Sequence, residues 1–169
     1  MDGLAGRSGS DTPLTPRLRQ RRGVIAVVED GTNLSDAIFD ICDFLEVTVR
    51  HVPSDADLAL VLADCQPMAV IASVQADGQD GCHVMKTVAG HDRHLPILVL
   101  TGGDPILAGA ADAVEEVWGL SCVAKRPVLP GPGELVEFFC LAGQMGRCVG
   151  LMPINQRSAT LASLSADAG

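Results

Sequence analysis

The 169-residue sequence has no tyrosine, one tryptophan and four phenylalanines. Aromatic side chains on which nucleic-acid bases could stack are therefore scarce. Acidic residues outnumber basic residues by 21 to 12, which gives a formal net charge of −9. A chain of that charge repels the phosphate backbone of DNA and RNA. Both shortages argue against nucleic acid as a partner.

The chain also lacks a long apolar run. No stretch approaches the roughly 20 residues that a membrane span needs, and the first residues lack the apolar core of a signal peptide. The six cysteines are scattered, mostly in apolar segments, and none forms the CxxC spacing of a zinc site. We therefore expect a soluble, cytoplasmic protein with reduced cysteines and no contact with membrane.

What the sequence does contain is a set of short apolar runs that alternate with helix-like segments. Apolar residues make up 47% of the chain, enough for one folded domain. The run Ala69–Ala72 is continuously apolar, as is typical of a parallel strand covered on both faces. Strands are predicted at Val24–Val28, Val47–Val52, Ala69–Ala72, Pro96–Leu100 and Ser121–Ala124.

Helical periodicity connects these strands, so that five helices alternate with five strands. Helices are predicted at about 34–45, 54–65, 82–89, 105–117 and 134–142. Asn33 or Ser35 is expected to cap the first helix, Ser54 the second, and Pro105 fits the first turn of the fourth. This order predicts an α/β fold with a doubly wound, five-stranded parallel sheet of the flavodoxin-like class.

Composition divides the chain into three parts. Residues 1–22 are rich in Gly, Ser, Thr, Pro and Arg, and are expected to form a disordered arm. Residues 23–145 form the predicted domain, and residues 146–169 a flexible tail with one apolar patch, Val149–Ile154. The arm carries a basic cluster that is either a solubilising feature or a docking segment for an acidic surface: Arg17, Arg19, Arg21 and Arg22.

Polar and charged residues follow four of the predicted strands. Glu29 and Asp30 come after the first strand, Ser73 after the third, Thr101 after the fourth, and Lys125-Arg126-Pro127 after the fifth. In doubly wound folds the functional site lies just beyond the carboxyl ends of the strands. These residues are therefore the candidate site.

Taken in order, these residues make the chain from 23 to 145 resemble the receiver domains of two-component response regulators. The loop with Gly78, Asp80 and Gly81 fits the same pattern. The resemblance implies that Glu29 and Asp30 match the acidic pair that holds magnesium, and that Thr101 matches the hydroxyl residue after strand four. It also implies that Ser73 stands where the family has the aspartate that accepts a phosphoryl group.

Three positions depart from the receiver pattern. Ser73 removes the nucleophilic carboxylate and one magnesium ligand, and a serine hydroxyl is a poor nucleophile without a base beside it. Arg126 falls where the lysine is expected, with Lys125 one residue earlier and pointing the other way. Val123 replaces the usual aromatic switch residue. We expect a degenerate site that binds magnesium weakly at most, through Glu29 and Asp30, and no enzymatic activity.

The sequence is thus interpreted as a pseudo-receiver that acts by protein–protein interaction. The resemblance implies a histidine kinase, a phosphotransfer protein or a regulator as partner. It also implies a partner or homodimer face built from the fourth helix, fifth strand and fifth helix. The sequence adds small residues and aromatic anchors to this face: Ala108, Gly109, Ala110, Ala111, Ala113, Trp118, Phe138 and Phe139.

Two alternatives remain open. The first is a working single-domain response regulator that is phosphorylated at another acceptor, such as Asp77 or Asp80. The second is a flavodoxin-like protein that binds a nucleotide or a flavin. The acidic loop Glu29-Asp30-Gly31 argues against the second, because a phosphate cradle needs free N–H groups and glycines.

Overall fold

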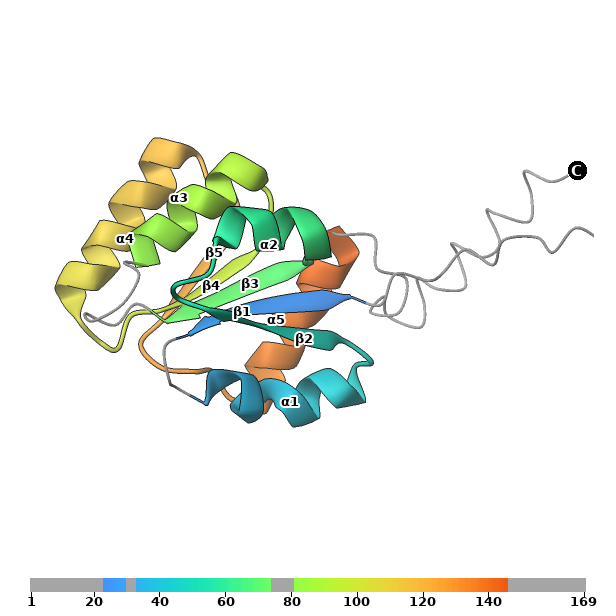
Figure 1. The fold of residues 1–169 in the computed structure, drawn as a ribbon. Helices are drawn as coiled ribbons and strands as arrows, with labels where there is room; N and C mark the ends of the chain where they lie inside the picture. Colours follow the sequence, from blue (N-terminus) through green and yellow to red (C-terminus); the bar gives the residue numbers. More distant parts are fainter. Residues whose placement is uncertain (1–22, 30–32, 74–80, 146–169) are drawn as a thin grey trace, which may run out of the picture.

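The computed structural model describes residues 23–29, 33–73 and 81–145. Five strands alternate with five helices along this part of the chain (Figure 1). The elements are β1 (Val24–Glu29), α1 (Leu34–Phe44), β2 (Thr48–Pro53), α2 (Leu58–Cys65), β3 (Ala69–Ser73), α3 (Gly81–His91), β4 (Ile97–Leu100), α4 (Pro105–Trp118), β5 (Val123–Arg126) and α5 (Pro132–Met145).

The strands form one parallel sheet in the order β2-β1-β3-β4-β5. The chain moves outward from β1 to β2, returns past β1 to β3, and then continues to β4 and β5. β1, β3 and β4 are central and almost wholly buried, whereas β2 and β5 are the edge strands. The predicted doubly wound, flavodoxin-like fold is confirmed.

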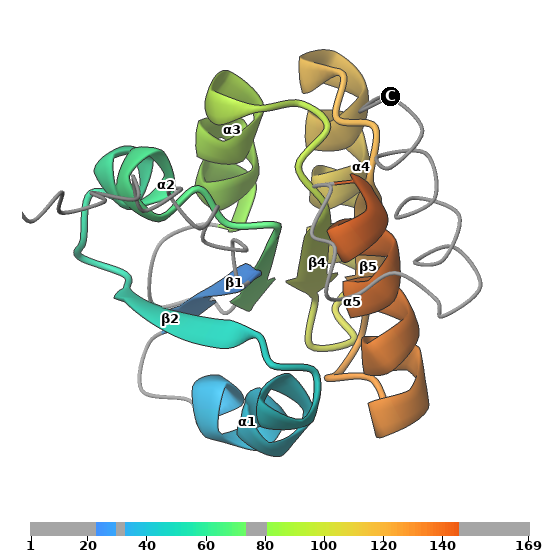
Figure 2. The same ribbon diagram turned by 90° about the vertical axis from the view of Figure 1, so that its right-hand side faces the viewer.

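Helices cover both faces of the sheet (Figures 1 and 2). Alternate side chains of the strands pack on one face against α2, α3 and α4, with Leu62, Met85 and Ala111 in that layer. The intervening side chains pack on the other face against α1 and α5, with Ile38 and Phe139 in that layer. The continuous apolar runs therefore have the pattern that a sheet covered on both faces requires.

The predicted helix starts are confirmed in part. Asn33 is at the N-cap position of α1, but its side chain makes no capping hydrogen bond. Asp57, not Ser54, caps α2 by accepting a hydrogen bond from the amide of Leu60. Pro105 is in the first turn of α4 as predicted, with Asp104 as the cap.

β5 begins two residues later than predicted and extends through the two basic residues. Ser121 belongs to the preceding loop, where its amide donates to the carbonyl of Arg93. Lys125 and Arg126 are tolerated in the strand because β5 is at the sheet edge, where long charged side chains reach solvent.

The predicted interaction residues are distributed over different environments. Ala111 and Phe139 are buried, so they are core residues and not part of an accessible face. Phe138 is half-buried and packs against the α1–α5 layer, while Trp118 is 43% exposed. Helix α4 thus turns at least one of its small residues, Ala111, towards the core.

None of the helices that the structure describes is both long and apolar enough to cross a membrane.

The five cysteines that the structure describes have free thiols, and Cys42 among them is buried in the layer of α1 and α5. Burial raises the pKa of the Cys42 thiol to about 11, as expected for a core cysteine that stays protonated.

Candidate functional site

The strand register brings four of the candidate residues to the same edge of the sheet. Val28 pairs with Ala72, so Glu29 and Ser73 are the next residues of adjacent strands. Ser73 is level with Leu100, which is level with Arg126 and is followed by Thr101. Glu29, Ser73, Thr101 and Arg126 thus lie at the carboxyl edge, where the sequence predicts the site.

The carboxylate of Glu29 is bound to the beginning of helix α1. The amide of Leu34 donates to one carboxylate oxygen at 2.7 Å. The amide of Ser35 donates to the other at 3.2 Å, and the hydroxyl of Ser35 donates to that same oxygen. Glu29 therefore replaces the missing Asn33 cap and satisfies amides that the first turn of the helix leaves without partners.

A histidine from the edge strand also lies beside this carboxylate. Nε2 of His51 on β2 lies 3.6 Å from Oε1 of Glu29, whose side chain is only 3% exposed. The location between a helix N-terminus and a histidine suits a negative charge that is buried. The same contacts give Glu29 a structural role at the start of α1.

The described residues do not assemble a cation site by themselves. Within residues 23–29, 33–73 and 81–145, no three side chains of His, Cys, Asp or Glu come close enough together to hold a metal ion. Magnesium needs several hard oxygen ligands. Asp30, the second member of the predicted acidic pair, lies outside the described residues, as do Asp77, Gly78 and Asp80.

Ser73 ends β3 and is half-buried. It offers a neutral hydroxyl at the position where the receiver pattern has a carboxylate. Gly81, the last residue of the predicted loop pattern, is the first residue of α3.

Thr101 is buried beside the last residue of β5. Its amide donates to the carbonyl of Arg126 at 2.8 Å, and its hydroxyl lies 3.4 Å from the same oxygen. The hydroxyl therefore holds the β4 and β5 ends together. A glycine pair with positive φ angles follows, Gly102 at 64° and Gly103 at 80°, which turns the chain sharply away from the sheet towards α4.

Lys125 points to helix α4 and not to the end of β3. Its ammonium group contacts the carboxylates of Asp112 and Glu115, which are one turn apart on α4. Partial burial by itself lowers the pKa of Lys125, but the hydrogen bonds and charges of the two carboxylates outweigh this effect. The pKa is therefore raised above its ordinary value of 10.5. We call Lys125, Asp112 and Glu115 the α4 clamp.

Val123 and Arg126 are the first and last residues of β5. The guanidinium of Arg126 donates to the carbonyl of Lys125 at 3.0 Å and lies 3.7 Å from Glu134 on α5. Val123 is half-buried and packs against the layer that contains α4. The two basic residues are thus directed to opposite helices, as the alternation along a strand requires.

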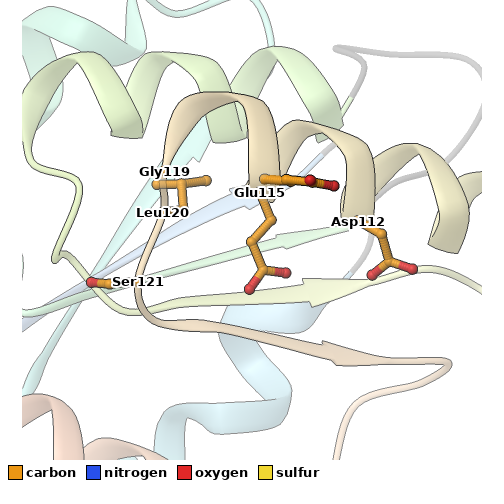
Figure 3. A pocket seen from close by; sticks show the side chains of 6 residues that line it. Asp112, Glu115, Gly119, Leu120 and Ser121 are labelled. Carbon is orange, nitrogen blue, oxygen red and sulfur yellow. The ribbon is translucent and has the colours of Figure 1, made fainter.

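The described part of the chain also has two hollows, one at the opposite edge of the sheet and one beside helix α1. One, of about 380 Å³, is formed where α4 ends and the chain turns into β5, and Asp112, Glu115 and Ser121 are among the residues around it (Figure 3). The other, of about 320 Å³, lies between α1 and β2 and includes Phe39 and His51. Sequence reasoning missed both the α4 clamp and these hollows, although the spacing of three residues between Asp112 and Glu115 places both on one side of a helix.

No family model and no curated protein matches the sequence. Solved structures do match. The chemotaxis protein CheY4 of Vibrio cholerae has a TM-score of 0.57 and 14% identity, with 72% of this chain and 98% of that chain covered. A putative response regulator from Chloroflexus aurantiacus has a TM-score of 0.55 and 24% identity, with 72% and 97% covered.

The beryllofluoride-activated receiver domain of NtrC is similar as well. Its TM-score is 0.52 and its identity 18%, and the match covers 69% of this chain and 90% of that domain. At these identities the similarity concerns the fold. The chain therefore has the fold of response-regulator receiver domains.

Proposed function

We propose that this protein is a receiver-like signalling protein that acts through protein–protein contacts and is not phosphorylated at the end of β3. The observation that carries this proposal is Ser73. It lies at the carboxyl edge beside Glu29 and near Thr101, yet it has no carboxylate to attack a phosphoryl group. A seryl hydroxyl becomes a useful nucleophile only when a base removes its proton.

The neighbouring charges support the same proposal. Phosphoryl transfer depends on cations that gather the phosphate oxygens. Lys125 is bound to α4, and Arg126 contacts the Lys125 carbonyl and Glu134. Glu29 holds the start of α1. Each of these groups stabilises the fold at this edge, which supports at most weak magnesium binding and no catalytic role.

Without phosphorylation at Ser73, the protein would signal by binding another protein. The partner would be a histidine kinase, a phosphotransfer protein or another regulator. We place its contact on the face made by α4, β5 and α5, which includes exposed apolar side chains such as Val128 and Leu141. Because no phosphate would control this face, binding depends on the abundance or the state of the partner.

Incubation with acetyl phosphate and magnesium tests the proposal. The wild-type protein should keep its mass, and beryllium fluoride should leave the amide signals of Ser73 and Thr101 unchanged in NMR spectra. Ser73→Asp is the matched variant that restores the carboxylate. A magnesium-dependent phosphoryl adduct on wild-type Ser73 contradicts the proposal.

The same experiment distinguishes the proposal from the first alternative, a response regulator that is phosphorylated at another residue. An adduct located by peptide mass spectrometry on Asp77 or Asp80 would identify a working receiver with another acceptor. It would leave the assignment of the fold intact but replace the proposed phosphate-independent mechanism.

A further inference from the structure

The outer side of β2 is an open strand edge. The amide of Thr48 donates to the carbonyl of Gly23 at 2.9 Å, so the backbone groups of Thr48 and of Arg50 face β1. By the alternation of a parallel strand, the amides and carbonyls of Val49 and His51 point away from the sheet. No described residue pairs with these outward groups, because β2 is the last strand on its side. An added strand could form hydrogen bonds with them.

Both ends of this edge are closed. Pro53 has no N–H, and its carbonyl accepts a hydrogen bond from the amide of Ala56 at 3.0 Å. At the other end, the amide of Val47 donates to the carbonyl of Cys42 of α1 at 2.8 Å. The open part of the edge is therefore short, which suits a peptide strand of a few residues.

The hollow of about 320 Å³ between α1 and β2 borders the open edge, because Val49 and His51 are among the residues around it. Its apolar lining includes the buried side chains of Cys42 and Val47 and the ring of Phe39, which is 59% exposed. Figure 2 shows β2 between α1 and α2, on the side of the molecule away from β5 and α5. This groove is thus separate from the proposed partner face.

The charge of the groove indicates what it would bind. Asp36 and Asp43 are exposed residues of α1 that border the hollow, and they are seven residues apart, so they lie on the same side of the helix. No lysine or arginine is among the described residues around the hollow. An arginine side chain suits this lining, because its planar guanidinium stacks on an aromatic ring such as Phe39 and pairs with a carboxylate.

A second copy of the chain suits the groove less well. It would bring the same two carboxylates and another net charge of −9 to the contact. Like charges placed opposite each other oppose association. The complementary occupant is therefore a positively charged segment of a different protein.

We propose that the groove between α1 and β2 binds an extended, arginine-containing segment of another protein, which adds to the sheet beside β2. Hydrogen bonds to the backbone of Val49 and His51 fix the register of the segment. Its alternate side chains enter the groove, where arginines meet Asp36, Phe39 and Asp43. This contact is additional to the α4–β5–α5 face.

A peptide of three Arg-Val repeats tests the proposal on the full-length protein. Its binding would be measured by fluorescence anisotropy at about 0.15 M salt, where long-range attraction is screened. Two modified peptides carry N-methyl groups either on the arginine amides or on the valine amides. Both keep the charge and the side chains. Only one of them should lose binding, on the order of tenfold or more, because only alternate amides of an added strand face β2.

Variants of the protein locate the contact. Val49→Pro removes an outward amide without removing a hydrogen bond to β1, and should weaken binding of the Arg-Val peptide on the order of tenfold. Val49→Ala is the matched control, because it shortens the same side chain and keeps the amide. Asp43→Asn should weaken binding about threefold, as for an exposed ion pair. Asp40→Asn changes the same charge on the same helix away from the hollow, and should have no effect. Circular dichroism checks the fold of each variant.

Several results overturn the proposal. Equal binding of the two N-methylated peptides, or equal effects of Asp43→Asn and Asp40→Asn, would show general attraction to an acidic protein. Absence of binding at about 1 mM peptide would show that the edge is not a docking site. A dimer in light scattering that Val49→Pro abolishes would assign the edge to a second copy. These results do not depend on Ser73 or on the α4–β5–α5 face, so they are distinguishable from failure of the proposed function.

Discussion

Glu29 shows how one carboxylate can have a structural role at a position that suggests metal binding. Its oxygens accept hydrogen bonds from Leu34 and from Ser35. The positive end of α1 stabilises the buried charge, and the ring of His51 lies beside it. The acidic residue at the end of β1 is consequently part of the connection between the sheet and the first helix.

Glu29→Gln should lower the free energy of unfolding by about 1–2 kcal/mol, because it removes a charged acceptor at a helix start. Urea denaturation monitored by Trp118 fluorescence measures this change, with no tyrosine signal to subtract. Asn33→Ala is the control. A capping asparagine is worth about 1 kcal/mol, but Asn33 makes no capping bond, so its loss should cost much less. An Asn33 effect larger than that of Glu29 would show that Glu29 is not the cap.

A second prediction at the residue scale concerns magnesium and position 73. The wild type should bind magnesium in the millimolar range or more weakly, because few oxygen ligands are available. Ser73→Asp adds a carboxylate next to Glu29 and should tighten binding by on the order of tenfold, or ~1.4 kcal/mol. Isothermal titration calorimetry compares the two, with Ser73→Ala as control. If the wild type binds as tightly as Ser73→Asp, another ligand is present.

The α4 clamp connects two elements that are adjacent only in the folded chain. Because the folded pKa of Lys125 is raised, its contribution to stability is complete below the ordinary pKa of 10.5 and is lost as the pH rises through the higher folded value. At neutral pH the clamp should contribute about 0.5–1 kcal/mol, since its groups are partly solvated.

Lys125→Met therefore should lower the free energy of unfolding by that amount at pH 7, and the difference from wild type should vanish only in alkaline solution well above pH 10.5. Urea melts at a series of pH values measure it. Lys86→Met on α3 is the matched control, because Lys86 is exposed. A difference that disappears below pH 9 would contradict the assignment of the clamp to the Lys125 ammonium.

At the scale of helices and strands, the sequence predicts which elements form better than it predicts the residues at which they begin and end. Continuous apolar runs such as Ala69–Ala72 identify buried parallel strands, since few other structures bury both sides of a short segment. The cap of α1 could not be predicted from local pattern, because Glu29 reaches it across a loop. The α4 clamp likewise depends on how α4 packs beside β5. The small size of Ala111 fits both a core and an interface, so the sequence pattern alone does not distinguish the two.

The whole molecule presents α4, β5 and α5 together as the proposed partner face. On α4, Ala108 shares its side with Asp112 and Glu115, which meet Lys125, whereas Ala113 points about 140° away around the helix. Ala108→Arg should therefore reduce capture of a partner from a lysate, and Ala113→Arg should not. Quantitative mass spectrometry of the captured proteins measures the effect, and circular dichroism checks the fold. Equal capture by the two variants would move the contact to another face, with α1 as the next candidate.

The directions of the outermost elements have a consequence for how the domain can be joined to other proteins. β1 starts at Val24 on the amino edge of the sheet, and α5, which runs opposite to β5, ends at Met145 on the same edge. Figure 1 shows both ends on the right-hand side. The described domain can therefore be spliced as a cassette into a surface loop of a host protein, as is tolerated when chain ends are near each other. In such a chimaera the edge with Glu29 and Ser73 would face away from the host.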